Sequence, residues 1–182
     1  MLFRSRQSSA ETLPYSDQTF DAVVSQFGLM FFNDRRLAIR EMIRVLVPGG
    51  RLSIAVWDKL ENSPAYEIEV SLLQTIAGQA AADALRAPFT LGGDGILAAL
   101  FESAGVNSAV VTTQNGTARF PSIRAMVEAD LRGWLPVVGV SLKEQQIHDI
   151  LLAAEDALRQ YVTAEGAVEF EMPAHIVTAT KS

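Results

Sequence analysis

The sequence predicts an α/β protein, and two observations support that prediction. Residues 20–57 read in order as a short apolar strand, an amphipathic helix and a second apolar strand. Further along, segments with helical periodicity alternate with shorter runs that are rich in β-branched residues. An apolar fraction of 49% against 20% charged residues is ordinary for a globular protein, and 182 residues are enough for one substantial core.

The first strand is expected at 20–27, FDAVVSQF, because a short apolar run bounded by turn formers is typical of a strand covered on both faces. The next helix has Asn33 or Asp34 as its N-cap and is expected to stop at Pro48-Gly49-Gly50. Residues 51–57, RLSIAVW, are the second strand. A strand, a crossover helix and a strand together predict a parallel pair.

Later segments supply the remaining elements. Ser63 is expected to cap an Ala-rich helical segment that begins at Pro64, and Asp94 to cap a short helix that ends at Gly105. The other expected elements are a strand within 107–120 with a turn at Asn115-Gly116, helices within 121–135 and 141–162, and a closing strand at 174–181. We expect a single domain, with its sheet core in 1–57, 93–120 and 165–182 and a helical cover made by 58–92 and 121–164.

Composition argues against several kinds of partner. A formal net charge of −6, without any run of lysine or arginine, argues against nucleic acid and anionic membranes. There is no cysteine, and no cluster of His, Asp or Glu has metal-ligand spacing, so we expect no metal. No stretch reaches the roughly 18 apolar residues of a membrane helix, and MLFRSRQSSAE lacks the apolar part of a signal peptide. We therefore expect a soluble, cytoplasmic protein.

A set of short motifs between Ser9 and Trp57 is specific when taken in order. They are Ala10-Glu11, Leu13-Pro14-Tyr15, Phe20-Asp21, and Arg-Val-Leu-Val-Pro-Gly-Gly at 44–50 before a strand. In this order they resemble class I S-adenosylmethionine-dependent methyltransferases, above all the type 11 group with its ubiquinone and menaquinone biosynthesis members. The resemblance implies a Rossmann-like sheet with a helical cover, S-adenosylmethionine as cofactor, and methyl transfer to a small-molecule acceptor.

The resemblance also implies where the cofactor would bind. Ligands of such folds sit outside the carboxyl ends of parallel strands, so Ser25, Gln26 and Phe27 would face the cofactor. Ser25 would offer its backbone carbonyl to the methionine amino group. Phe27 and Met30 would be apolar walls around the sulfonium and the adenosine.

Further site residues follow from the same resemblance. Ser9 and Ala10 would approach the adenine, while Tyr66, Trp134 and Tyr161 are candidates for shaping the acceptor pocket. No catalytic residue is assigned, because displacement at a sulfonium needs alignment and desolvation more than acid-base chemistry.

Two features of the family have no counterpart in the sequence: the strand with a glycine-rich loop, and the acidic residue that grips the ribose hydroxyls. We therefore expect a sheet that is incomplete at its N-terminal side, with Met1–Arg4 as a remnant of the preceding strand, and incomplete cofactor binding. The strand at 20–27 would then have an unpaired edge, which predicts a homodimer or higher oligomer.

Two other functions are considered. One is a catalytically silent fragment that serves as an oligomeric scaffold or binding module. The other, a nucleotide-binding oxidoreductase, is disfavoured because no Gly-x-Gly-x-x-Gly follows a strand.

Overall fold

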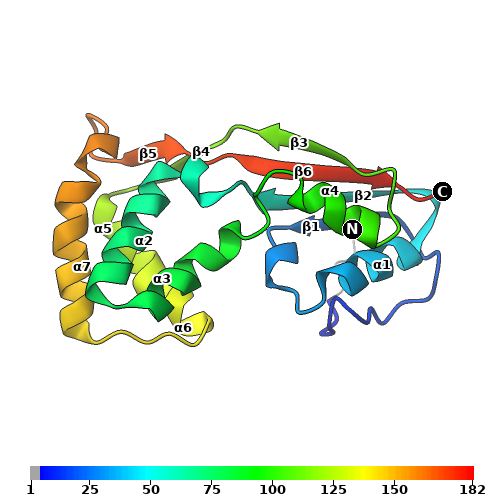
Figure 1. The fold of residues 1–182 in the computed structure, drawn as a ribbon, viewed down its shortest axis with the longest axis horizontal. Helices are drawn as coiled ribbons and strands as arrows, with labels where there is room; N and C mark the ends of the chain where they lie inside the picture. Colours follow the sequence, from blue (N-terminus) through cyan, green and yellow to red (C-terminus); the bar gives the residue numbers. More distant parts are fainter. Residues whose placement is uncertain (1–4) are drawn as a thin grey trace. The chain divides into compact units, whose positions relative to one another are not determined.

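The computed structural model describes residues 5–182, which fall into two compact units (Figure 1). The first unit contains the residues up to Trp57, Leu91–Gln114 and Ala174–Ser182, and the second contains Asp58–Thr90 and Asn115–Pro173. Residues 115–120 and 165–173 thus lie with the helical unit, whereas the sequence had suggested that they lie with the sheet. The expected strand remnant at Met1–Arg4 is outside the described residues.

The first unit is a mixed sheet with helices. Its strands are β1 (Phe20–Gln26), β2 (Leu46–Trp57), β3 (Val110–Gln114) and β6 (Ala174–Thr180), and its helices are α1 (Arg35–Val45) and α4 (Ile96–Ser103). The strand order is β1-β2-β6-β3, with β1 parallel to β2 and β6 antiparallel to both of its neighbours (Figure 1). The α/β class and the parallel pair of the first two strands are therefore confirmed.

The connection between β1 and β2 begins as the sequence suggests and ends differently. Asp34 is the N-cap of α1, and its carboxylate accepts a hydrogen bond from the Leu37 amide at 2.9 Å. The helix ends at Val45, and β2 begins directly at Leu46, so Pro48-Gly49-Gly50 lies within the strand and does not stop the helix. The pairing register shifts there, because Phe20 pairs with Leu46 and Ala22 pairs with Arg51. Residues 47–50 form a bulge, helped by the left-handed φ of +78° at Gly49.

The N-cap expected at Asp94 is wrong. The residue at that position of α4 is Gly95, with a φ of +74° and no side-chain cap. A left-handed residue turns the chain into the helix one position later than the sequence suggests, because glycine adopts this conformation without steric cost.

One face of the sheet packs against α1 and α4, and this layer holds the core of the first unit. The core is a single cluster of buried side chains: Leu29, Met30, Ala38, Ile39, Met42, Leu46, Leu52, Ile54, Val56, Leu91, Leu97, Phe101, Ala104, Val106, Val177 and Ala179. Among the described residues β1 has no partner on its outer edge, because it is the last strand of the sheet.

The second unit is mostly helical. Its helices are α2 (Pro64–Ile76), α3 (Gln79–Arg86), α5 (Ile123–Glu128), α6 (Leu135–Val137) and α7 (Glu144–Ala157), with a π-helical turn at Ala129–Trp134. Short 3-10 turns occupy Leu60–Asn62, Ala87–Phe89 and Arg159–Tyr161, and strands β4 (Thr117–Phe120) and β5 (Val168–Glu171) pair antiparallel. The turn at Asn115-Gly116 separates two strands as expected, but β3 and β4 belong to different sheets.

Within the part of the chain that the structure describes, we find no helix with the length and apolar character that crossing a bilayer requires.

Phe101 gives a direct test of the first unit's core, since its side chain is 0% exposed in α4. Phe101→Ala should lower the free energy of unfolding by about 3–5 kcal/mol, because it removes buried apolar surface and leaves a cavity. Denaturant unfolding measures the change. Leu152→Ala, at a side chain that is 68% exposed, should change it by less than about 0.5 kcal/mol, and equal losses in both variants would contradict this core.

Candidate functional site

The chain reverses direction where β1 ends. Phe27 has a left-handed φ of +52°, which is uncommon for an aromatic residue, and its amide donates to the Ala55 carbonyl at 2.9 Å. Gly28 follows, where a Cβ would lie 3.1 Å from Ser25 Oγ. The 3-10 turn Leu29–Phe31 then directs Leu29 and Met30 into the core. Backbone strain of this kind is concentrated at functional sites.

The carboxyl ends of the two parallel strands carry a stacked aromatic pair. The rings of Phe27 and Trp57 lie 3.8 Å apart at their centroids with an interplanar angle of 15°. Gln26, immediately before Phe27, is exposed and pairs with Ala55 in the sheet. These strand ends therefore present a flat apolar surface beside the solvent-exposed amide of Gln26. Such a combination is suited to an aromatic base or a cationic group.

The segment before β1 is fixed to the beginning of α1. The Glu11 carboxylate accepts hydrogen bonds from the backbone amides of Asn33 at 2.9 Å and Asp34 at 3.2 Å, and Ser9 Oγ donates to the same carboxylate. The hydrogen bond from Ser9, followed by those from the backbone, lowers the pKa of Glu11. Ala10 packs against the core beside this anchor.

A second anchor lies at the end of α1. Arg44 donates to the backbone carbonyls of Leu13 and Tyr15 and forms ion pairs with Asp17 at 2.7 Å and Glu41 at 2.6 Å. The hydrogen bond from Arg44 lowers the pKa of Glu41. The two anchors hold the 9–17 segment on α1, so the Leu-Pro-Tyr motif has a structural role.

The six residues expected at the cofactor have different environments. Ser9 and Gln26 are exposed, Ala10, Ser25 and Phe27 are half-buried, and Met30 is only 3% exposed within the core. Met30 is held there in part by Arg35, whose guanidinium donates to its carbonyl at 2.7 Å. Phe27, Met30 and Ala10 share one cluster. Of the six residues, Ser9 and Gln26 thus face solvent, while Ala10, Phe27 and Met30 lie in or against the core.

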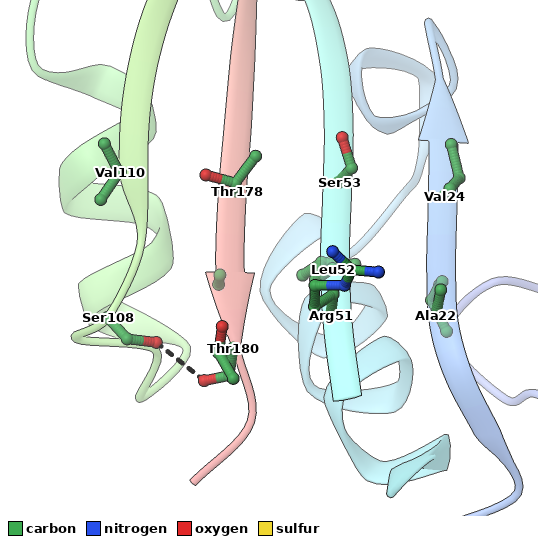
Figure 2. A pocket seen from close by; sticks show the side chains of 11 residues that line it. Ala22, Val24, Arg51, Leu52, Ser53, Ser108, Val110, Thr178 and Thr180 are labelled. Atoms are coloured by element: carbon green, nitrogen blue, oxygen red, sulfur yellow. Dashed lines mark hydrogen bonds between the residues drawn. The ribbon is translucent and has the colours of Figure 1, made fainter. Parts of the chain in front are cut away.

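The other face of the sheet is open and forms a shallow hollow of about 510 Å³ (Figure 2). Figure 2 shows Val110, Thr178, Ser53 and Val24 in one row across the four strands, which agrees with their pairing register. A second row contains Ser108, Thr180, Arg51 and Ala22, in which Ser108 Oγ donates to the Thr180 carbonyl at 3.0 Å. Val24 is 72% exposed. The open edge of β1 borders this hollow.

In the second unit, two of the three residues expected at the acceptor pocket share an aromatic neighbour. The Tyr66 and Tyr161 rings lie 5.7 Å and 6.0 Å from the Phe170 ring. The third, Trp134, holds two segments together: its indole N–H donates a hydrogen bond to the Ala84 carbonyl at 3.0 Å, which joins the π-helical turn to α3.

Two acidic residues of this unit, Glu69 and Asp130, were not expected from the sequence to belong to a site. Glu69 of α2 is 0% exposed, and neither of its carboxylate oxygens has a hydrogen-bond partner among the described residues. Asp130 lies in the π-helical turn. A signal for Glu69 exists in the sequence, since it is four residues from both Ala65 and Leu73 and so lies on the apolar stripe of α2.

Burial favours the neutral form of both carboxyls. It raises the pKa of Asp130 to about 7 and the pKa of Glu69 well above its usual range, with Asp130 as a further cause for Glu69. Burial also raises the pKa of the Tyr66 phenol, helped by the charges of Asp130 and Glu69.

These shifts predict that the second unit loses stability in alkali. A carboxyl whose pKa is raised by folding binds more protons when folded, so its contribution is complete below the ordinary carboxyl pKa of about 4. That contribution disappears as the pH rises through the raised value of about 7. The thermal midpoint should fall between mildly acidic and mildly alkaline buffer, and Glu69→Gln, which removes one buried charge, should flatten this fall and raise the midpoint in alkali by several degrees. A midpoint that rises equally with pH in both proteins would contradict this assignment.

Histidines and metal ligands offer no alternative site within residues 5–182. His175 has both ring nitrogens in hydrogen bonds, to Thr113 Oγ1 at 2.9 Å and to the Gly92 carbonyl at 3.1 Å. His148 is on the exposed side of α7. No group of three or more His, Asp or Glu side chains in this described part could hold a metal ion.

Comparison with known proteins finds relatives for the N-terminal third of the chain. Residues 2–54 match the family described as a methyltransferase domain. The chain is 49% identical over 62 residues to a ubiquinone/menaquinone biosynthesis C-methyltransferase of Pasteurella multocida, which is 34% of this chain and 23% of that protein. The protein of the same name in Saccharophagus degradans is 47% identical over 57 residues, 31% of this chain and 23% of the relative. The matched segment thus spans about a quarter of the length of these relatives.

Solved structures show the same fold at low sequence identity. A methyltransferase of an antibiotic biosynthesis pathway from Anabaena variabilis has a TM-score of 0.61 and 15% identity, covering 96% of this chain and 72% of its own. A methyltransferase from Bacillus halodurans has a TM-score of 0.54 and 15% identity, covering 96% and 76%. Residues 2–54 are thus similar to a methyltransferase domain, and the chain as a whole shares the fold of these solved structures.

Proposed function

We propose that this chain takes part in methyl transfer from S-adenosylmethionine to a small-molecule acceptor, with the cofactor at the carboxyl ends of β1 and β2. The observation that supports this most is the stacked Phe27 and Trp57 pair beside the exposed Gln26. Ligands of open parallel sheets bind at such strand ends. S-adenosylmethionine is the cofactor of the family and, when bound, supplies an electrophilic methyl group on a sulfonium.

The proposed roles follow from the environment of each residue. Phe27, half-buried and in a left-handed conformation, would present its ring to the cofactor, where an aromatic face attracts a sulfonium cation. Gln26 would hydrogen-bond to the cofactor's polar groups, and the Ser25 carbonyl would accept from its amino group. Met30 would support the wall from within the core, while Ser9 and Ala10 would border the adenine.

A second proposal concerns assembly. The open edge of β1 next to the hollow in Figure 2 favours association of two copies through this edge. A sheet edge with free backbone groups and an exposed valine such as Val24, 72% exposed, is a template for strand pairing. This property also suits the alternative function, an oligomeric binding module without methyl transfer.

S-adenosylhomocysteine tests the cofactor site by a thermal shift. A ligand that binds only the folded state stabilises it by about 2.7 kcal/mol at a hundredfold excess over its Kd. We expect a saturable rise of the midpoint at weak affinity, because only one wall of the cofactor site is expected in these residues. Phe27→Ala should abolish the rise, and Val137→Ala at an exposed position should keep it. A wild-type midpoint that does not move at saturating ligand would refute cofactor binding and favour the binding module.

Sedimentation of the purified chain tests the assembly. We expect dimers or larger species at micromolar concentration, and monomers for Val24→Lys, because a charge on the exposed face of the edge strand β1 opposes pairing. Leu152→Lys, also at an exposed apolar position, is the matched control and should not change the distribution. A monomeric wild-type chain, or identical behaviour of both variants, would exclude this interface.

A further inference from the structure

We propose that the second unit binds a small organic cation with at least one N–H group, a protonated amine, between Tyr66, Glu69 and Asp130. As a statement about the methyl acceptor this rests on the proposed function. As a statement about binding it stands on the second unit alone.

Glu69 is the strongest indication of a ligand. Its side chain is fully buried in the middle of α2, and both carboxyl oxygens lack a hydrogen-bond partner among the described residues. Buried polar atoms are nearly always paired, and an unpaired one costs about 1–3 kcal/mol or more. A donor from a ligand would satisfy these oxygens.

Asp130 and Tyr66 are the titratable groups that influence Glu69 or are influenced by it. Tyr66 precedes Glu69 by three residues in α2, and the charge of Asp130 contributes to raising the pKa of both groups. Asp130 lies in a π-helical turn, a distortion that is frequent at functional sites. Asp130 and Tyr66 are each partly exposed while Glu69 is sealed, so a ligand entering from the surface would reach Glu69 last.

The protein's nearest basic side chain in sequence is engaged elsewhere. Arg132, two residues after Asp130, directs its guanidinium to both carboxylate oxygens of Glu144 at 2.8 Å and to Glu128 at 3.5 Å. Those bonds lie on the exposed side of the unit, since Arg132 and Glu144 are both exposed. Arg132 therefore does not supply a partner for the Glu69 carboxyl, whose oxygens have no hydrogen-bond partner among the described residues.

Tyr66 belongs to a cluster of aromatic rings. Tyr66 lies 5.6 Å from the Phe89 ring and 5.7 Å from the Phe170 ring, and Tyr161 and Phe120 contact Phe170 at 6.0 Å and 6.2 Å. Ring faces attract organic ammonium groups and do so more strongly away from water. A bound ammonium would donate to the Glu69 oxygens and favour their ionised form, whereas a neutral donor would gain only the hydrogen bonds.

A pair of isosteric probes tests the proposal without any cofactor. N,N-dimethylaminoethanol in its protonated form and 3-methylbutan-1-ol have the same shape and differ in the charge and N–H at one atom. Titration of the full chain, followed by backbone amide NMR, measures both affinities. The amine should bind at least about tenfold more tightly than the alcohol, as expected for a charge-assisted contact with ring faces.

Matched variants locate the site. Glu69→Gln preserves the shape of the side chain, but the amide cannot ionise against a bound ammonium. The substitution should therefore weaken amine binding by about tenfold, a typical value for a buried charge-assisted hydrogen bond. Glu155→Gln, at an exposed acid of α7, should leave the affinity unchanged. Near-ultraviolet circular dichroism reports whether Glu69→Gln folds. If it does not fold, Asp130→Asn is the second test variant.

Three results would overturn the proposal: equal binding of the two probes, no saturable binding of the amine, or unchanged affinity in the folded Glu69 or Asp130 variant. Because no cofactor is present, failure here is distinct from failure to bind S-adenosylhomocysteine. Amine binding without cofactor binding would support an amine site and contradict only the proposed transfer.

Discussion

The parallel pairing of β1 with β2 is the constraint on which the first unit depends. It brings residues 26 and 27 next to residues 55–57, although thirty positions of sequence separate them. The crossover through α1 is fixed at both ends by charged side chains. Glu11 accepts hydrogen bonds from the backbone amides just before the helix, and Arg44, near the end of the helix, donates to the carbonyls of Leu13 and Tyr15. With these anchors in place, the strained turn at Phe27 can present an aromatic ring at the strand ends and still send Met30 into the core.

The two units divide the proposed chemistry. The first offers an apolar, aromatic surface with few charges at its strand ends. The second buries the carboxyl of Glu69 completely and that of Asp130 in part, which costs free energy unless a ligand or a proton compensates them. A methyltransferase needs one site for a cationic cofactor and another for an acceptor. The different electrostatic character of the two units agrees with such a division, and the proposed association of copies would use the open edge of β1.

Much of the fold could be predicted from the sequence because local signals and long-range order agree there. The FDAVVSQF run, the Asp34 cap and the RLSIAVW strand lie close together along the chain, and their motifs occur in a fixed order. Two boundaries could not be predicted: Pro48-Gly49-Gly50 bulges inside a strand, and Gly95 takes the N-cap position at which Asp94 was expected. Both depend on left-handed glycines, whose conformation is set by tertiary pairing and is not visible in the sequence.

Site residues were predictable only where a motif marks them. Ser25, Gln26 and Phe27 follow a recognisable strand, but the partner of Phe27 could not be inferred, because Trp57 joins it only through the sheet register. Glu69 was readable from its place on the apolar stripe of α2, whereas Asp130 depends on a π-helical turn that no residue pattern indicates. Likewise, the pairing of β4 with β5 brings together strands about fifty residues apart.

The central claim is that the ends of β1 and β2 form one wall of a cofactor site, and backbone amide NMR of the labelled chain titrated with S-adenosylhomocysteine tests it most directly. The account predicts that the largest saturable shifts occur at Gln26, Phe27 and Gly28 and at Trp57. Shifts confined to other parts of the chain, or no shifts at saturating ligand, would contradict it.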